Sequence, residues 1–240
     1  MKEARYFYVP NASSSNELPE EEARHAVKVL RLQPKDEIFL MDGAGSFFQA
    51  EVSLTSSKHC LYEIKQQFPQ APTWKGHIHL AIAPTKDMGR IEWMVEKATE
   101  VGFNEISFLN CQFSERKILK TERIERIVVS AMKQSRKPWK PIVNEMLNYD
   151  AFMKKELKGN KFICHCYNEI ERKDFFTELT KKDFQDDITV LVGPEGDFSI
   201  NEVNKAIENG YESVTLGKSR LRTETAGLSA VLIANLANRT

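Results

Sequence analysis

The sequence lacks the signatures of several common enzyme classes. It contains no G-x-x-x-x-G-K-[ST] loop and no G-x-G-x-x-G turn after a strand, which argues against P-loop phosphoryl transfer and an ordinary dinucleotide fold. It also has no G-x-S-x-G elbow and no H-E-x-x-H helix. No apolar run approaches the roughly 20 residues that cross a bilayer. We therefore expect no membrane partner, no targeting segment and a cytoplasmic location.

Cysteine is scarce, and charge of either sign is not in excess. The four cysteines form no paired C-x-x-C knuckles, so reduced thiols are expected. In an extended Cys164-His165-Cys166 the histidine would point away from both cysteines, which favours a buried strand end and no metal. Lysine plus arginine and aspartate plus glutamate number 34 each, so attraction to a polyanion must come from local patches.

The chain of 240 residues divides into two patterns, and it is long enough for one large core or two modest ones. The first pattern is a set of short strands, with a helix at Glu20 to Leu30, and it predicts a small antiparallel barrel. Its strands are expected at 37–41, 47–54 and 60–64. A linker is expected from Gln66 to Thr73, where prolines interrupt the periodicity.

Strands and helices alternate from the linker onward, which predicts an α/β fold with a mostly parallel sheet. Strands are expected at 77–83, 106–109, 161–166, 188–192 and 213–216. Helices are expected at 91–101 and 122–137, from Ser199 to a C′ glycine at Gly210, and from about Thr225. Ser199 and Glu202 form a capping box, and Thr223 and Thr225 are candidate N-caps.

Basic residues gather around the predicted helix at 122–137, and Trp139 follows it. A solvated helix face explains such a run, and so does a surface that binds RNA through phosphate contacts and base stacking. A second basic and aromatic set lies near the N-terminus. The residues that we predict to bind RNA are Arg5, His25, Lys28, Arg31 and Arg136.

The stretch Ile188 to Val192 reads as a buried strand, and a Gly-Pro-Glu-Gly corner and a capped helix follow it. This order places free backbone groups at the carboxyl edge of a sheet, where α/β proteins bind ligands. A tight turn without a ligand remains the alternative. A second segment, LGKSRLRTETAGL, also runs from a strand through a glycine turn into a helix of small residues.

Together, GPEGDFSINEV and LGKSRLRTETAGL resemble the GPEGG and LGxxxLRTETA signatures of the SPOUT-class RNA methyltransferases. Within that class the sequence resembles the RsmE type, which methylates N3 of a uridine in 16S ribosomal RNA. The segments RYFYV, HAVKVLRL, DGAG, KATEVGF and AMKQSRK have counterparts there, so the resemblance covers essentially the whole chain.

The resemblance implies a PUA-like β-barrel that binds RNA at residues 1–68 and a knotted SPOUT domain, with a trefoil knot, at residues 74–240. It implies S-adenosylmethionine as cofactor, the small ribosomal subunit as partner, and a homodimer. Cofactor contacts are expected from three loops, at Cys166, Gly193, Pro194, Glu195, Gly196, Leu216, Gly217, Ser219 and Leu221. Arg222 and Glu224 are the candidate catalytic residues. Arg222 would place positive charge near a carbonyl oxygen of the uracil, and Glu224 would take the N3 proton or orient Arg222.

Some residues depart from the family pattern. Asp197 stands where a second glycine is usual, which suits a left-handed position because aspartate tolerates that conformation. Lys218, Ser219 and Arg220 stand where proline, arginine and an aliphatic residue are more frequent. Two rival functions stay open: a ribose 2′-O-methyltransferase of the same class, and a ribosome-assembly factor that binds RNA without turnover.

Overall fold

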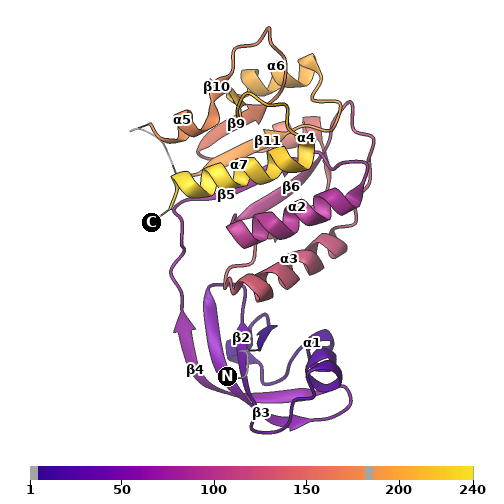
Figure 1. The fold of residues 1–240 in the computed structure, drawn as a ribbon, viewed down its shortest axis with the longest axis vertical. Helices are drawn as coiled ribbons and strands as arrows, with labels where there is room; N and C mark the ends of the chain where they lie inside the picture. The colour runs from indigo at the N-terminus through magenta and orange to yellow at the C-terminus, as the bar shows by residue number, and fades with distance from the viewer. Residues whose placement is uncertain (1–4, 182–185, 240) are drawn as a thin grey trace. The chain divides into compact units, whose positions relative to one another are not determined.

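A computed structural model describes residues 5–181 and 186–239. Contacts divide the chain into two compact units, Met1–Pro72 with Val129–Lys140, and Thr73–Val128 with Pro141–Thr240. Figure 1 shows the mostly β first unit and the layered second unit. The domain limits at residues 68 and 74 stay a prediction.

The first unit contains a four-stranded sheet in the order β1-β2-β3-β4. β1 pairs with β2 in parallel, and the other pairs are antiparallel. The three predicted strands are confirmed, but the predicted linker begins too early because Gln66 to Pro69 still pair with β3. The elements are β1 (Tyr6–Tyr8), η1 (Ala12–Ser14), α1 (Glu20–Arg24), a π-helical turn η2 (His25–Val29), β2 (Glu37–Met41), β3 (Ser46–Thr55) and β4 (Cys60–Pro69).

The core of the first unit lies on one side of this sheet. Phe7, Ile38, Leu40 and Phe48 are almost fully buried there, together with Ala23 and Ala26 of the helical segment. Alternation along the strands turns Tyr6, Phe39 and Phe47 to the opposite face, where the Tyr6 ring contacts both phenylalanine rings.

The second unit is built on a parallel sheet in the order β10-β12-β9-β11-β5-β6-β7, with β8 pairing β6. The strands are β5 (Ile78–Ile82), β6 (Glu105–Asn110), β7 (Ile142–Val143), β8 (Leu147–Asn148), β9 (Asn160–Cys164), β10 (Lys173–Asp174), β11 (Ile188–Val192) and β12 (Glu212–Thr215). The helices are α2 (Met88–Val101), α3 (Thr121–Ser135), α4 (Tyr149–Met153), α5 (Phe175–Leu179), α6 (Ile200–Glu208) and α7 (Thr223–Ala237). The expected α/β fold with a mostly parallel sheet is confirmed.

Helices cover both faces of the sheet, so every residue of the central strands β5 and β11 is buried. Gly227 of α7 lies against Leu80, Ile82 and Met94, which places α7 and α2 on one face. Figure 1 shows these two helices side by side. Tyr149 and Phe152 of α4 and Val203 of α6 pack with Ala81 and Leu191 on the other face.

Several local signals are confirmed residue by residue. The side chain of Ser199 accepts a hydrogen bond from the Glu202 amide, and the Glu202 side chain accepts one from the Ser199 amide, which completes the capping box. Gly210 follows the C-cap of α6 with φ +81°, and Tyr211 N donates to Ala206 O, as in a Schellman motif. The predicted N-cap of α7 is wrong, because Arg222 occupies that position without a side-chain cap.

Candidate functional site

The candidate site lies where three neighbouring parallel strands end. Cys164 of β9 is in register with Val192 of β11 on one side and with Val214 of β12 on the other. The chain leaves the sheet just beyond this row at all three places. Loops from distant parts of the sequence therefore meet at one edge, the usual ligand edge of an α/β sheet.

The corner after β11 is held by a dense set of hydrogen bonds. Asp197 N donates to Pro194 O at 2.9 Å, which closes the turn, and Asp197 adopts φ +68°. The position is therefore left-handed, which is the condition under which aspartate was expected to replace the usual glycine. Phe198 is fully buried, and the Tyr167 hydroxyl donates to its carbonyl at 2.7 Å. The corner is therefore preorganised by the protein itself.

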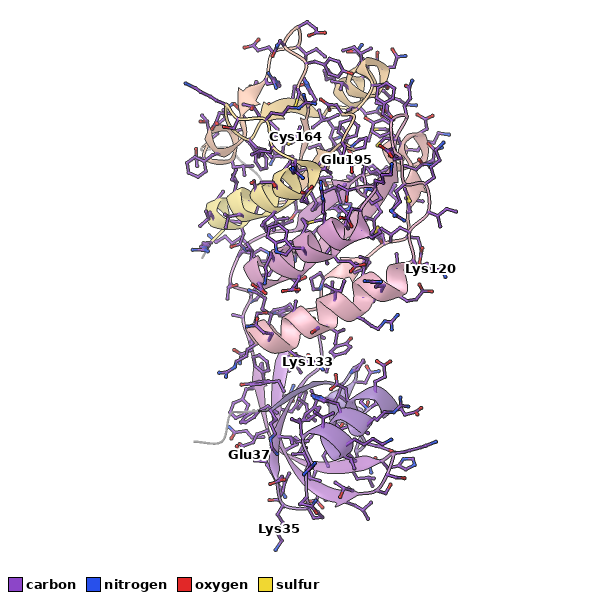
Figure 2. All side chains as sticks on the ribbon, turned by 45° about the vertical axis from the view of Figure 1, so that its right-hand side comes forward. Lys35, Glu37, Lys120, Lys133, Cys164 and Glu195 are labelled. Carbon is purple, nitrogen blue, oxygen red and sulfur yellow. The ribbon has the colours of Figure 1, made fainter. Side chains whose placement is uncertain are left out.

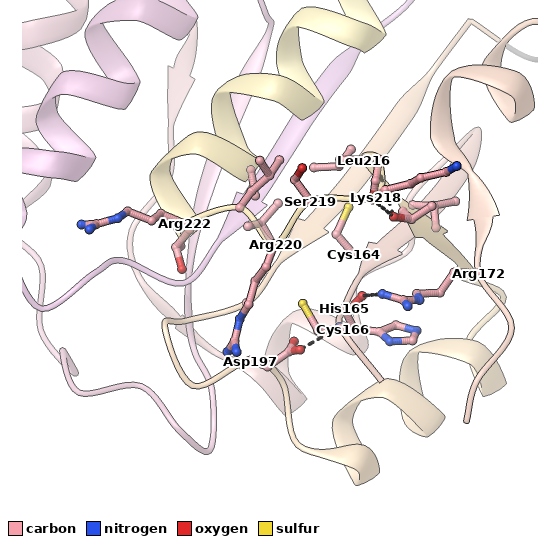
Figure 3. Close-up of a pocket in the computed structure, with 18 of the residues that line it drawn as sticks. Cys164, His165, Cys166, Arg172, Asp197, Leu216, Lys218, Ser219, Arg220 and Arg222 are labelled. Carbon is pink, nitrogen blue, oxygen red and sulfur yellow. Dashed lines mark hydrogen bonds between the residues drawn. The ribbon is translucent and has the colours of Figure 1, made fainter. Parts of the chain in front are cut away.

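Asp197 also joins two loops of the site. One carboxylate oxygen accepts a hydrogen bond from Cys166 N at 2.8 Å, and the other accepts one from Phe198 N at 2.8 Å. Figure 3 shows the Asp197 carboxylate beside Cys166, with the Arg220 side chain reaching toward it. The loop after β9 and the loop after β11 are therefore fixed to each other by one side chain.

The loop after β12 closes the site from the third side. The Thr215 hydroxyl donates to Gly217 O at 2.7 Å, and Gly217 adopts φ +129° with open space where a Cβ would lie. The loop then passes through Lys218 to Leu221 and enters α7 at Arg222. Thr223 and Glu224 are both buried in the first turn of that helix.

These loops enclose a cavity of about 1030 Å³. Its lining includes Arg90, the strand ends at Cys164, Val192 and Val214, and the loops that follow them. Figure 2 labels two lining residues, Cys164 at the end of β9 and Glu195 in the loop after β11. A pocket of this size holds a small organic molecule or cofactor.

The sulfur and imidazole groups at this edge are uncharged at neutral pH. Burial raises the pKa of Cys164 to about 12, and burial together with Asp197 raises the pKa of Cys166. Burial lowers the pKa of His165, whose Nδ1 accepts a hydrogen bond from Tyr167 N. Because nucleophilic attack needs a thiolate, the raised pKa values of these thiols disfavour covalent catalysis by the cysteines.

Glu224 is the unusual acid of the site. The residue is 8% exposed, and its Oε1 lies 3.8 Å from Nη1 of Arg90 on α2. Its Oε2 is buried and has no hydrogen-bond partner among the described residues. A buried carboxylate oxygen without a partner costs free energy, which a donor on a bound molecule would offset.

Comparisons with known proteins agree with this geometry. An RNA methyltransferase domain matches residues 72–235, and an RNA methyltransferase PUA domain matches residues 18–65. The chain belongs to this RNA methyltransferase family. Its fold is therefore the SPOUT-type α/β domain with an N-terminal PUA-like domain, as expected from the sequence.

Individual relatives cover nearly the whole chain. The ribosomal RNA small subunit methyltransferase E of Aquifex aeolicus is 32% identical, over 90% of this chain and 92% of its own length. The crystal structure of a probable rRNA-methyltransferase from Porphyromonas gingivalis is 38% identical, with a TM-score of 0.88 and 98% of each chain covered. A ribosomal RNA small subunit methyltransferase E from Neisseria gonorrhoeae bound to S-adenosyl methionine is 29% identical, with a TM-score of 0.80 and 95% of each chain covered.

The methyltransferase domain brings together most of the residues predicted from its loops. The predicted residues that line the cavity are Cys166, Gly193, Pro194, Glu195, Leu216, Gly217, Ser219, Leu221, Arg222 and Glu224. Gly196 lies outside the lining and packs against Phe113. The Glu195 carboxylate accepts a hydrogen bond from Lys86 N at 2.9 Å, so it holds the loop after β5.

Several lining residues were not predicted from the sequence, and three of them make interactions that shape the site. Arg90 reaches the site from α2, and nothing in its local sequence distinguishes it from a surface arginine. Arg172 donates to His165 O at 2.8 Å and steadies the loop after β9. Asp197 was noticed as a departure from the family pattern, but its bond to Cys166 N joins residues 31 positions apart.

The cavity suits S-adenosylmethionine on its own chemistry. The strand-end loops offer backbone groups, and Gly217 leaves open space. The lining contains five basic and five acidic side chains, which suits a ligand that carries charges of both signs, as S-adenosylmethionine does. The residues expected to hold the cofactor are those of the three loops. Among the described residues, no cluster of three or more His, Cys, Asp or Glu side chains could hold a metal ion, and no helix is long and apolar enough to cross a membrane.

The residues predicted to bind RNA all lie in the first unit. His25, Lys28 and Arg31 are exposed on the helical segment and the residues that follow it. Arg5 is half-buried and pairs with Asp36 at 3.7 Å, and the Arg136 guanidinium lies 5.3 Å from the centre of the Tyr6 ring. Their role in binding stays a prediction.

Proposed function

We propose that this chain transfers a methyl group from S-adenosylmethionine to N3 of a uridine in 16S ribosomal RNA of the small ribosomal subunit. The observation that carries the proposal is the buried, unpartnered oxygen of Glu224 in a cavity formed by three strand-end loops. The membership in the RNA methyltransferase family and the names of the relatives support the substrate class. We place this activity in the cytoplasm, where small subunits are assembled.

The cofactor supplies a methyl group that is already activated on a sulfonium, so the protein must chiefly orient the two reactants. Uracil N3 carries a proton, which leaves as the new bond between nitrogen and carbon forms. We propose that Glu224 takes this proton on Oε2 and that Arg90 holds the carboxylate in place. The proposed proton transfer thus gives a function to the buried carboxylate of Glu224.

We propose that Arg222 stabilises negative charge on a carbonyl oxygen of the uracil. Arg222 is exposed at the N-terminus of α7, and Figure 3 shows its side chain extending away from Cys166 and Asp197. It is therefore available to a base that enters from solvent. Charge placed where it develops during the reaction is typically worth several kcal/mol.

We propose that the active form is a homodimer. Leu232 and Leu236 are one turn apart on α7, with exposed fractions of 39% and 44%, and Trp93 of the neighbouring α2 is 48% exposed. Such exposed apolar side chains on adjacent helices suit burial against a second copy. Sedimentation equilibrium should give twice the chain mass, and Leu232→Asp should shift the equilibrium toward the monomer.

Nucleoside analysis tests the proposed reaction. The protein is incubated with S-adenosylmethionine and small ribosomal subunits that lack the modification, and the digested RNA is examined by mass spectrometry. A 3-methyluridine product supports the proposal. A 2′-O-methylated nucleoside would assign the chain to ribose methylation, and failure to methylate or to bind the cofactor would favour a non-catalytic assembly factor.

A further inference from the structure

Trp139 packs against the turn between β2 and β3 within the first unit. Gly45 N donates to Pro138 O at 3.0 Å, and Lys140 N donates to Gly43 O at 2.9 Å, so backbone hydrogen bonds flank the tryptophan on both sides. Gly45 adopts φ +105°, and a Cβ at this position would clash with the six-membered ring of Trp139. The indole therefore lies directly on the hairpin and has little freedom to rotate.

This fixed indole is still 37% exposed. A tryptophan that served only the core would bury nearly all of its surface, as Trp74 does with 7% exposed. A rigid aromatic ring with an open side loses little conformational entropy when it binds a partner. Trp139 therefore has the properties of a stacking platform.

The neighbouring Arg136 has a backbone conformation that favours another residue. It follows the last residue of α3 with φ +53°, and Lys137 N donates to Met132 O at 3.0 Å, as in a helix that ends on a C′ glycine. Glycine would adopt this conformation without strain. The arginine side chain is exposed and lies over the Tyr6 ring, so its charge is held three residues from Trp139.

We infer that Trp139 stacks on an unpaired base of the RNA substrate and that Arg136 pairs with a phosphate beside that base. The inference rests on the proposed action on RNA and deepens it by naming the contact. Aromatic stacking with flanking cations is how proteins bind single-stranded RNA, and Lys137 and Lys140 add positive charge to the same segment. A second copy of the chain is the competing occupant of this surface.

Tryptophan fluorescence tests the stacking contact. The Trp93→Phe protein keeps the exposed Trp139 and the buried Trp74, whose indole donates to Asn104 at 2.9 Å and serves as an internal reference. A uridine-rich single-stranded oligoribonucleotide should quench its emission, and an RNA duplex of the same charge should not. The quenching should disappear in Trp93→Phe/Trp139→Phe. Equal quenching in the variant without Trp139 would overturn the inference. It would also be overturned if the Trp139 emission changed with protein concentration in the absence of RNA, because a second copy of the chain would then cover the ring.

Two matched variants test the phosphate contact. Arg136→Gly and Lys35→Gly each remove one positive charge and each relieve a left-handed backbone, with φ +53° and +75°. Figure 2 shows Lys35 at the end of the first unit remote from Lys133 of α3. Both variants should melt at or above the temperature of the parent protein. Only Arg136→Gly should weaken RNA binding, with the slope of log K against log salt reduced by about 0.7.

Equal losses of affinity in the two variants would overturn the inference. These measurements need neither cofactor nor turnover, so they separate the inference from the proposed function. A chain that binds RNA through Trp139 and transfers no methyl group would refute only the reaction. A chain that forms 3-methyluridine while Trp139→Phe and Arg136→Gly bind RNA normally would refute only the stacking contact.

Discussion

The bond between Asp197 and Cys166 makes a graded prediction for substitutions of Asp197. A charge-assisted hydrogen bond of this kind contributes about 1.5 to 3 kcal/mol. The left-handed backbone costs a residue with a Cβ about 1 kcal/mol more than glycine. Asp197→Ala loses the bond and keeps the strain that the parent already has, so it should destabilise by about 2 kcal/mol, the contribution of the bond alone. Asp197→Gly loses the bond but relieves the strain, so it should destabilise by only about 1 kcal/mol.

Asparagine is the matched conservative variant. It tolerates the left-handed conformation and retains an oxygen that can accept the hydrogen bond from Cys166 N, so Asp197→Asn should destabilise by less than about 1 kcal/mol. Urea unfolding should show the loss of stability increasing from the asparagine variant through the glycine variant to the alanine variant. Equal stabilities for the alanine and glycine variants would refute the assigned backbone cost.

The same series should order the affinity for S-adenosylmethionine. Without the bond, the loop after β9 is no longer held to the loop after β11, so calorimetry should show about tenfold weaker binding for Asp197→Ala, equivalent to about 1.4 kcal/mol. Asp197→Asn should bind within a few-fold of the parent. An alanine variant that binds the cofactor as tightly as the parent would contradict the positioning role.

Three further outcomes follow from the site and its surroundings. Glu224→Gln should lower the methyl-transfer rate by about 10² to 10⁴-fold with cofactor affinity little changed, because an amide cannot take the proton; a normal rate would exclude Glu224 as the base. Burial lowers the pKa of His79 from 6.5 to about 4, so the unfolded state binds a proton more readily than the folded state as the pH falls below 6.5. The free energy of unfolding should therefore decrease by about 2 kcal/mol between pH 7 and pH 5, and urea titrations of His79→Gln should show a smaller decrease. Gly45→Ala should destabilise by more than about 1 kcal/mol, because a methyl group there meets Trp139 and the backbone has φ +105°; unchanged unfolding would contradict the pinned indole.

Local signals in the sequence were sufficient where neighbouring residues determine the structure. The strand Ile188–Val192, the capping box of Ser199 and Glu202, and the C′ glycine at Gly210 depend on residues within a few positions of one another. The short helices α4 and α5 and the two-residue strands β7, β8 and β10 were not predicted. Such short elements form because they pack on or pair with a sheet assembled from distant segments.

In the site, too, features set by neighbouring residues were predicted and features set by distant residues were not. The loops after β11 and β12 were identified from their motifs, because glycine turns and helix starts have local signatures. The ion pair of Arg90 with Glu224 and the bond of Asp197 to Cys166 N join elements far apart in the sequence. The N-cap of α7 was misassigned because a threonine was expected where Arg222 lies, and the position of a helix start depends on how the helix packs.

The number of methyl groups that each small ribosomal subunit accepts tests the central claim most directly. Subunits lacking the modification are incubated with the protein and S-adenosylmethionine labelled in the methyl group, and the label in the 16S RNA is counted at saturation. The account predicts a plateau near one methyl group per subunit, all of it recovered as 3-methyluridine. No incorporation, or label spread over several nucleosides, would contradict it.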